Sequence, residues 1–142
     1  MSDEDRTLNK DITLNATPEA VWQALTDPEK TKQFLFGCEA ISTWEVGAPL
    51  NFQMTMGGET MTIVKGVIEE VEPHAVLQHT CFEARYENDP SQHTTARYQL
   101  EAVPEGTRLT IRQGAFPTAE QCAQNSASWD MALGGLKQIV EE

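Results

Sequence analysis

The segment LNFQMTM, residues 50–56, constrains the fold of this chain more than any other part of the sequence. Apolar residues alternate with polar ones along it, and the apolar set is Leu50, Phe52, Met54 and Met56. Successive side chains of a β-strand point to opposite faces, so this pattern predicts a strand with one apolar face. Two glycines follow directly, and a Gly-Gly pair between strand-like runs predicts a hairpin turn.

Six further runs have the pattern of strands. The longest covers residues 59–73 and ends at Pro73, and Gly66 within it indicates a bulge or a bend. The tripeptide PEG, residues 104–106, joins the last two runs as another hairpin. The other predicted strands are residues 8–16, 40–46, 75–82, 93–103 and 107–116.

Three segments carry helix signals. Thr17 and Asp27 are good N-cap residues, and each is followed by a proline at the first helical position. They predict two short helices, at residues 17–27 and 27–35. A longer helix begins near residues 118–120 and includes the closing segment WDMALGGLKQIVEE.

The order of elements is one strand, two short helices, six strands in hairpins and one long helix. Strands and helices that are segregated in this way predict an α+β fold with an antiparallel, twisted sheet. The long helix can cover the inner face of that sheet. A chain of 142 residues is expected to form a single domain over residues 1–142, with residues 1–7 as a frayed tail.

Five motifs in this order resemble a known family. They read ITLNATPEAVWQALTDPEKTKQF, WEVGAPLNF, GVIEEVEPHAVLQHT, GTRLTI and a closing W…GGLKQIVEE. Together they resemble the activator of heat-shock protein ATPase homologue type, within the START/polyketide-cyclase-like (SRPBCC) superfamily. The resemblance extends from about residue 11 to residue 140. It implies a helix-grip architecture, in which a seven-stranded antiparallel sheet curls around the C-terminal helix and encloses a cavity.

The resemblance does not select one function. It implies that members bind lipids, hormones or polyketides, that some perform cyclase or hydrolase chemistry, and that some are chaperone partners. A fold of this kind hosts several functions, so the site has to be argued from residues.

The charge of the chain excludes two classes of partner. Ten basic and 22 acidic residues give a net charge of −12. An acidic surface repels phosphate groups, so we expect neither nucleic acid nor a membrane as a partner. A basic patch on a protein or a neutral small molecule remains compatible with this charge.

Targeting signals and cysteine usage indicate a cytoplasmic protein. The segment MSDEDRTLNKD is polar and acidic, unlike a signal peptide, and no apolar run approaches the length of a membrane helix. Cys38, Cys81 and Cys122 are odd in number and widely spaced, which fits reduced thiols better than a disulfide framework.

The sequence contains no motif for a metal, a cofactor or a catalytic centre. The three histidines never occur at i, i+4, and HExxH, CxxC and GxSxG are all absent. His79 and Cys81 share a strand face and, with Met54 or Met56, form at most a soft-metal site. Ordinary packing of the same side chains is the favoured alternative. The two side chains are about 7 Å apart on a strand, too far for direct activation of the thiol.

Two arginines in the last two predicted strands are candidate ligand-binding groups. Arg97 and Arg112 alternate out of phase with the apolar residues of their strands. We therefore expect both to point to solvent and to pair with acidic neighbours such as Glu101. An arginine that holds a ligand carboxylate inside a cavity is the alternative.

The remaining candidates are apolar groups that a cavity can use. Methionine is flexible and polarizable, so methionines beside aromatic residues suit an adaptable pocket. An ordinary filled core is the alternative for each of them. The predicted lining residues are Trp44, Phe52, Met54, Met56, His79, Phe82, Tyr98, Trp129, Leu133 and Gly135.

The last of these residues belongs to a glycine pair in the final helix. On a helical wheel, Gly135 lies on the flank of the apolar stripe and Gly134 lies on the opposite side. Each glycine costs about 0.5–1 kcal/mol relative to alanine in a helix interior. We expect Gly135 to leave space for a ligand, and Gly134 has no comparable role.

The sequence favours a non-enzymatic, cytoplasmic protein that binds a small hydrophobic ligand between the sheet and the C-terminal helix. A chaperone-associated or stress-response interaction protein is the first alternative. A cyclase- or hydrolase-type enzyme that uses His79 is the second. Both a monomer and a homodimer remain open, because an edge strand can pair while acidic side chains oppose pairing.

Overall fold

Seven antiparallel strands form one sheet in the computed structural model of the chain, which describes residues 6–114 and 116–141. Their spatial order is β1-β7-β6-β5-β4-β3-β2. The strands are β1 (Leu8–Leu14), β2 (Glu39–Ile41), β3 (Pro49–Met56), β4 (Glu59–Glu72), β5 (Val76–Glu83), β6 (Thr94–Val103) and β7 (Gly106–Gly114).

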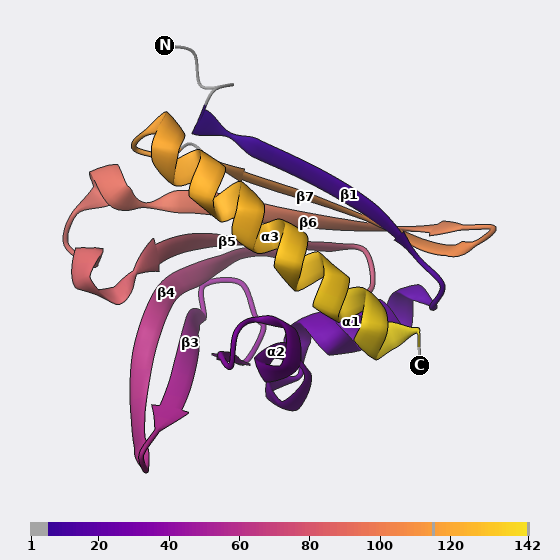
Figure 1. Ribbon diagram of the computed structural model, residues 1–142, viewed down its shortest axis with the longest axis horizontal. Helices are drawn as coiled ribbons and strands as arrows, with labels where there is room; N and C mark the ends of the chain where they lie inside the picture. Colours follow the sequence, from indigo (N-terminus) through magenta and orange to yellow (C-terminus); the bar gives the residue numbers. More distant parts are fainter. Residues whose placement is uncertain (1–5, 115, 142) are drawn as a thin grey trace.

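The long helix α3 (Ala119–Val140) crosses the concave face of this curled sheet (Figure 1). Two short helices, α1 (Pro18–Thr26) and α2 (Pro28–Phe34), follow β1 and lie beside the C-terminal half of α3. Two 3₁₀ turns, η2 (Ala84–Tyr86) and η3 (Pro90–Gln92), connect β5 to β6. The predicted α+β helix-grip fold is thus confirmed.

The polar residues that precede each helix form the predicted caps. The Thr17 hydroxyl accepts a hydrogen bond from the Ala20 amide at 3.2 Å. The Asp27 carboxylate accepts one from the Glu29 amide at 2.9 Å. Because a cap satisfies an amide that has no partner within the helix, these residues fix where each helix begins.

The second predicted strand is much shorter than the sequence indicates. Residues 40–46 have strand-like composition, yet β2 ends at Ile41. Trp44 has a φ of 60°, in the left-handed region, and strands do not continue through that conformation. Half-buried Trp44 instead packs against the main core from the loop.

Gly66 lies in β4 where two strand backbones approach closely. A Cβ atom at this position would lie 1.8 Å from the Thr80 carbonyl oxygen of β5. The β4–β5 register shifts nearby, between Ile68 and Glu70, and the Val67 amide donates to the Thr80 hydroxyl at 2.9 Å. The predicted irregularity in this strand is therefore present, and only glycine fits at its closest contact.

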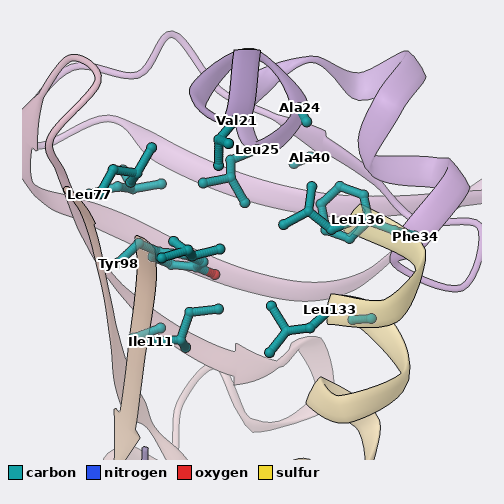
Figure 2. Close-up of a cluster of buried hydrophobic side chains, with 14 of the residues drawn as sticks. Val21, Ala24, Leu25, Phe34, Ala40, Leu77, Tyr98, Ile111, Leu133 and Leu136 are labelled. Carbon is teal, nitrogen blue, oxygen red and sulfur yellow. The ribbon is translucent and has the colours of Figure 1, made fainter. Parts of the chain in front are cut away.

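The core lies between α3, α1 and the middle of the sheet. Leu133 and Leu136 extend from α3 into a cluster that also contains Leu25 of α1 and Tyr98 and Ile111 of the sheet (Figure 2). Leu136 and Ile111 have no exposed surface. The apolar stripe predicted on the last helix is buried or half-buried throughout, and it consists of Trp129, Ala132, Leu133, Leu136, Ile139 and Val140.

The predicted N-terminal tail is described only in part. Residues 1–5 lie outside the described residues. Arg6 is held against the segment before α3, because its carbonyl accepts from the Phe116 amide at 2.7 Å and its guanidinium donates back to the Phe116 carbonyl at 3.1 Å.

Candidate ligand cavity

A cavity of about 250 Å³ lies between the concave face of the sheet and the first half of α3. Strands β3 to β7, the helix and the loop after α2 all contribute to its wall. The lining residues are Leu35, Phe36, Cys38, Phe52, Val64, His79, Cys81, Ala96, Tyr98, Gln113, Asn125, Ser128, Trp129 and Ala132. Most of these side chains are aromatic or aliphatic.

Two further spaces adjoin this cavity. One of about 20 Å³ extends toward α1 and α2, where Trp44 contributes to the wall. The other is a polar hollow of about 360 Å³ on the side of η2 and η3. Val64, Cys81, Gln113 and Asn125 border both the main cavity and this polar hollow. The main cavity therefore has an apolar inner end and a polar outer end.

Strand periodicity places the inner residues on one face. His79 and Cys81 are two apart on β5, and Ala96 and Tyr98 are two apart on β6, so each pair shares the concave face. His79 and Ala96 are direct cross-strand partners. The small Ala96 side chain beside His79 leaves part of the space open.

His79 has both ring nitrogens engaged. Its Nδ1 lies 2.8 Å from the Thr80 carbonyl oxygen, and its Nε2 lies 3.2 Å from the Tyr98 hydroxyl. A carbonyl oxygen only accepts, so Nδ1 carries the proton and donates to Thr80. Nε2 then accepts a hydrogen bond from the Tyr98 hydroxyl. This arrangement fixes one neutral tautomer of the imidazole.

Aromatic rings surround this histidine. The ring centroids of His79 and Tyr98 are 5.5 Å apart and nearly stacked. Phe52 lies 6.0 Å from His79, and Trp129 meets Tyr98 edge to face at 5.8 Å. Such rings favour flat apolar guests because stacked and edge-to-face contacts add to simple burial.

A chain of neutral hydrogen bonds closes the opposite wall. The Trp129 indole donates to Gln113 Oε1 at 2.8 Å, and Gln113 Nε2 donates to the Thr94 hydroxyl at 2.9 Å. The Thr94 hydroxyl donates in turn to the Cys81 carbonyl at 3.1 Å. Since an indole only donates, the chain also fixes the orientation of the Gln113 amide.

Burial keeps the titratable groups of the cavity uncharged. It lowers the pKa of the His79 imidazole to about 4, and the hydrogen bond to Thr80 opposes only part of that effect. Burial raises the pKa of the Cys81 thiol to about 12 and also raises the pKa of the Tyr98 phenol. At pH 7 the imidazole is a weak base and the thiol a weak nucleophile, so the arrangement suits binding better than acid–base or thiolate chemistry.

Six of the ten predicted lining residues border the main cavity or one of the two spaces that adjoin it. Phe52, His79, Tyr98 and Trp129 line the main cavity, and Trp44 lines its small extension. Phe82 borders the polar hollow instead, where its ring stacks on His93 at 4.0 Å.

The two predicted methionines lie outside the cavity. Both lie in the last part of β3, next to the turn into β4, and neither borders the main cavity or the two spaces that adjoin it. Half-buried Met54 approaches Gly37 instead, since its Cε lies 3.8 Å from a Cβ atom built on that glycine. Met56 is 65% exposed. The alternation predicts the strand correctly. It gives no information on how far the strand extends relative to the helix that covers the sheet.

Leu133 and Gly135 also do not line the cavity. Leu133 is buried in the main core. A Cβ atom on Gly135 would lie 3.1 Å from Phe34 Cβ, so this glycine allows α2 to pack closely on α3. The expectation that Gly135 leaves space for a ligand is corrected: the space is taken by Phe34.

Sequence reasoning missed the polar and small lining residues. Gln113 lies two residues from the apolar Ile111, and Asn125 lies one helical turn before Trp129. Periodicity therefore assigns both to inward faces, but it does not distinguish a cavity residue from a core residue there. The loop residues Leu35, Phe36 and Cys38 carried no such signal.

Arg97 lies on the other face of the sheet. It donates to Glu70 at 2.9 Å and to Gln78 at 2.8 Å, so its partners differ from the predicted Glu101. Arg112 is exposed. Neither residue borders the cavity.

The described residues, 6–114 and 116–141, contain no cluster of three or more His, Cys, Asp or Glu side chains suited to a metal ion. None of the helices in these ranges combines the length and apolarity needed to cross a bilayer.

The family model described as Activator of Hsp90 ATPase homolog 1-like protein matches residues 15–141. A Cytophaga hutchinsonii protein solved in solution has a TM-score of 0.78 at 25% identity, covering 95% of this chain and 93% of its own. The Aha1 dimer from Colwellia psychrerythraea has a TM-score of 0.73 at 22% identity, and the match covers 95% of this chain and 96% of that chain. CalU16 from Micromonospora echinospora has a TM-score of 0.69 at 20% identity, and the match covers 94% of this chain and 74% of that chain. No match was found among curated proteins. The resemblance inferred from the five motifs is thereby confirmed.

Proposed function

We propose that this chain, which belongs to the Activator of Hsp90 ATPase homolog 1-like family, binds a small hydrophobic molecule between the sheet and α3. The observation that carries the proposal is the cavity of about 250 Å³ with its aromatic and aliphatic wall. The fold of the family is compatible with ligand binding.

The size and the character of the cavity support this function. An apolar cavity of about 150 Å³ is known to stay dry and to bind benzene. A space of about 250 Å³ therefore accommodates a molecule of roughly two fused rings. Burial lowers the pKa of His79 and raises the pKa of the Cys38 and Cys81 thiols in its wall, so these groups are held uncharged, which favours binding over catalysis.

The test uses 1-naphthylamine, a neutral two-ring dye whose fluorescence shifts to shorter wavelength in apolar surroundings. We expect it to bind the wild-type protein and to raise its melting temperature. Ala132→Trp fills the cavity, and Ser128→Trp narrows it from an exposed position, so each should weaken dye binding at least tenfold.

The matched control is Ala127→Trp, on the exposed side of the same helix. It should bind the dye as the wild type does. Equal dye binding by all four proteins would locate the dye outside the cavity and refute the proposal. The Ser128→Trp variant keeps the test valid if Ala132→Trp fails to fold.

A chaperone-associated function is the second candidate, supported by the family name and by the Aha1 neighbour. Phe36, Met56 and Met61 supply exposed apolar surface that a protein partner can cover. This function predicts that the chain co-purifies with a heat-shock ATPase and that salt weakens the complex, because the chain is strongly acidic. An Ala132→Trp variant should retain this interaction while losing the dye.

The cyclase- or hydrolase-type alternative rests on His79 alone. The imidazole borders the cavity, but its Nε2 lone pair accepts from the Tyr98 hydroxyl and its Nδ1 donates to Thr80, so a substrate would have to displace Tyr98 to reach it. Its low pKa weakens it as a general base at neutral pH, so this alternative has the least support.

A further inference from the structure

We propose that the cavity selects an uncharged molecule with a flat apolar body and one hydroxyl or amide group, which lies between Gln113 and Asn125. This inference rests on the proposed binding function and specifies the chemical class of the ligand.

The wall of the main cavity offers no charge to a ligand. None of its lining residues is Asp, Glu, Lys or Arg. In the adjoining polar hollow, Glu83 and Arg85 pair with each other at 3.2 Å, and both are exposed. A carboxylate or an ammonium ion would therefore lose its hydration in the main cavity without gaining a counter-charge. Both kinds of ligand are disfavoured.

Gln113 supplies a hydrogen-bond donor at the junction of the two spaces. Its Oε1 accepts from Trp129, and one of its two amide protons goes to Thr94. No described residue accepts the second proton of Nε2. Because the chain of hydrogen bonds fixes the amide, this proton is available to a ligand that enters from either space.

Asn125 supplies an acceptor at the same junction. Its Nδ2 donates to the Gln121 carbonyl at 2.9 Å, one helical turn earlier. That bond directs the amide nitrogen to the helix, and Oδ1 has no partner among the described residues. A neutral donor and a neutral acceptor that border the same space match a hydroxyl or a carboxamide, which accepts and donates at once.

The inner end of the cavity accommodates the apolar body. Phe52, Tyr98 and Trp129 present ring surfaces there, and Ala96 leaves room between them. The ligand thus extends from these rings to the amides of Gln113 and Asn125. A molecule without the polar group would bind less tightly, because the second Nε2 proton of Gln113 and the Oδ1 atom of Asn125 would gain no partner from it.

Calorimetry with four related naphthalenes tests this assignment at pH 7. They are 2-naphthol, 2-methoxynaphthalene, 2-naphthoate and 2-naphthylmethylammonium. We expect 2-naphthol to bind about fivefold more tightly than the methoxy compound, which cannot donate. Both ions should bind more weakly than the methoxy compound, by about tenfold or more. Equal or tighter binding of either ion would overturn the inference.

Two variants of Asn125 assign the effect to the junction. Asn125→Leu removes the acceptor, so 2-naphthol and 2-methoxynaphthalene should bind equally. Asn125→Asp adds a carboxylate, so 2-naphthylmethylammonium should gain about tenfold over its binding to wild type. The control Gln138→Leu, on the exposed surface of α3, should leave all four affinities unchanged.

The outcomes separate the two proposals. If neither the dye nor any of the four compounds binds in the cavity, the proposed function fails. Only the ligand class is wrong if 2-methoxynaphthalene competes with the dye and 2-naphthol binds no more tightly than it does. The same conclusion holds if Asn125→Leu still binds 2-naphthol more tightly than 2-methoxynaphthalene.

Discussion

At the scale of single residues, the cavity depends on His79 being buried and neutral. The side chain is 2% exposed, and both ring nitrogens are committed to neighbours. A polar group with this degree of burial is tolerated because its hydrogen bonds are satisfied. The same pairing with Thr80 and Tyr98 holds the ring against the cavity wall, so it serves both stability and the shape of the site.

The burial of His79 predicts a dependence of stability on pH. Its pKa falls from an ordinary value near 6.5 in the unfolded chain to about 4 in the fold. Between these values the unfolded state binds more protons, so the free energy of unfolding falls as the pH drops from about 6.5 toward 4. The loss attributable to this group approaches about 3 kcal/mol.

Urea denaturation of the wild type and of His79→Gln between pH 7 and pH 4.5 measures this contribution. Glutamine can still hydrogen-bond Tyr98 but does not titrate. The advantage of the wild type over the variant should shrink as the pH falls. A constant advantage would mean that His79 does not titrate as its burial requires. Gln99→Ala, at an exposed position of β6 that does not titrate, should keep the full pH dependence.

At the scale of elements, the glycine pair shows how α3 meets its neighbours. Gly135 lies against Phe34 of α2, whereas nothing lies within 4 Å of a Cβ atom built on Gly134. Of these two adjacent residues, only Gly135 is required to be glycine by a neighbouring element. The close approach of α2 to α3 needs Gly135, and Gly134 only weakens the helix.

Alanine at each position distinguishes these roles. Gly134→Ala should raise the free energy of unfolding by about 0.5–1 kcal/mol, because alanine has the higher helix propensity and meets nothing. Gly135→Ala gains the same propensity but compresses the contact with Phe34, so it should be less stable than Gly134→Ala. Chemical denaturation of the two variants measures the difference. Equal stabilisation would show that the contact between α2 and α3 adapts freely.

The elements also show where sequence reasoning succeeds and where it fails. The alternation at residues 50–56 was sufficient to predict β3, and the cap at Thr17 was sufficient to predict the start of α1, because both signals are local. The end of β2 was not predictable, since it depends on the left-handed backbone of Trp44. Met54 lies two residues after Phe52 in β3, yet only Phe52 borders the cavity, because the packing of distant segments decides which of them reaches it.

At the scale of the whole molecule, the site is assembled from segments that are distant in sequence. Its wall combines the loop after α2, five strands and α3. The large aromatic lining residues could be predicted because they are few and alternate with polar residues. Gln113 and Asn125 could not, because a polar residue on an inner face becomes recognisable only once its neighbours are known.

The net charge of −12 is also a property of the whole molecule, and it predicts that salt stabilises the fold. Folding brings carboxylates together, and salt screens their repulsion. The seven ion pairs among the described residues all lie at the surface, where each contributes at most about 1 kcal/mol. Their loss in salt should therefore not outweigh the relief of repulsion.

Thermal denaturation at pH 7 in sodium chloride from about 0.02 to about 0.5 M tests this balance. The melting temperature should rise by a few degrees over that range. Glu105→Lys changes an exposed turn residue and reduces the net charge from −12 to −10, so it should raise the melting temperature most at low salt and flatten the response. A melting temperature that falls with salt would mean that the surface ion pairs contribute more than the excess carboxylates cost.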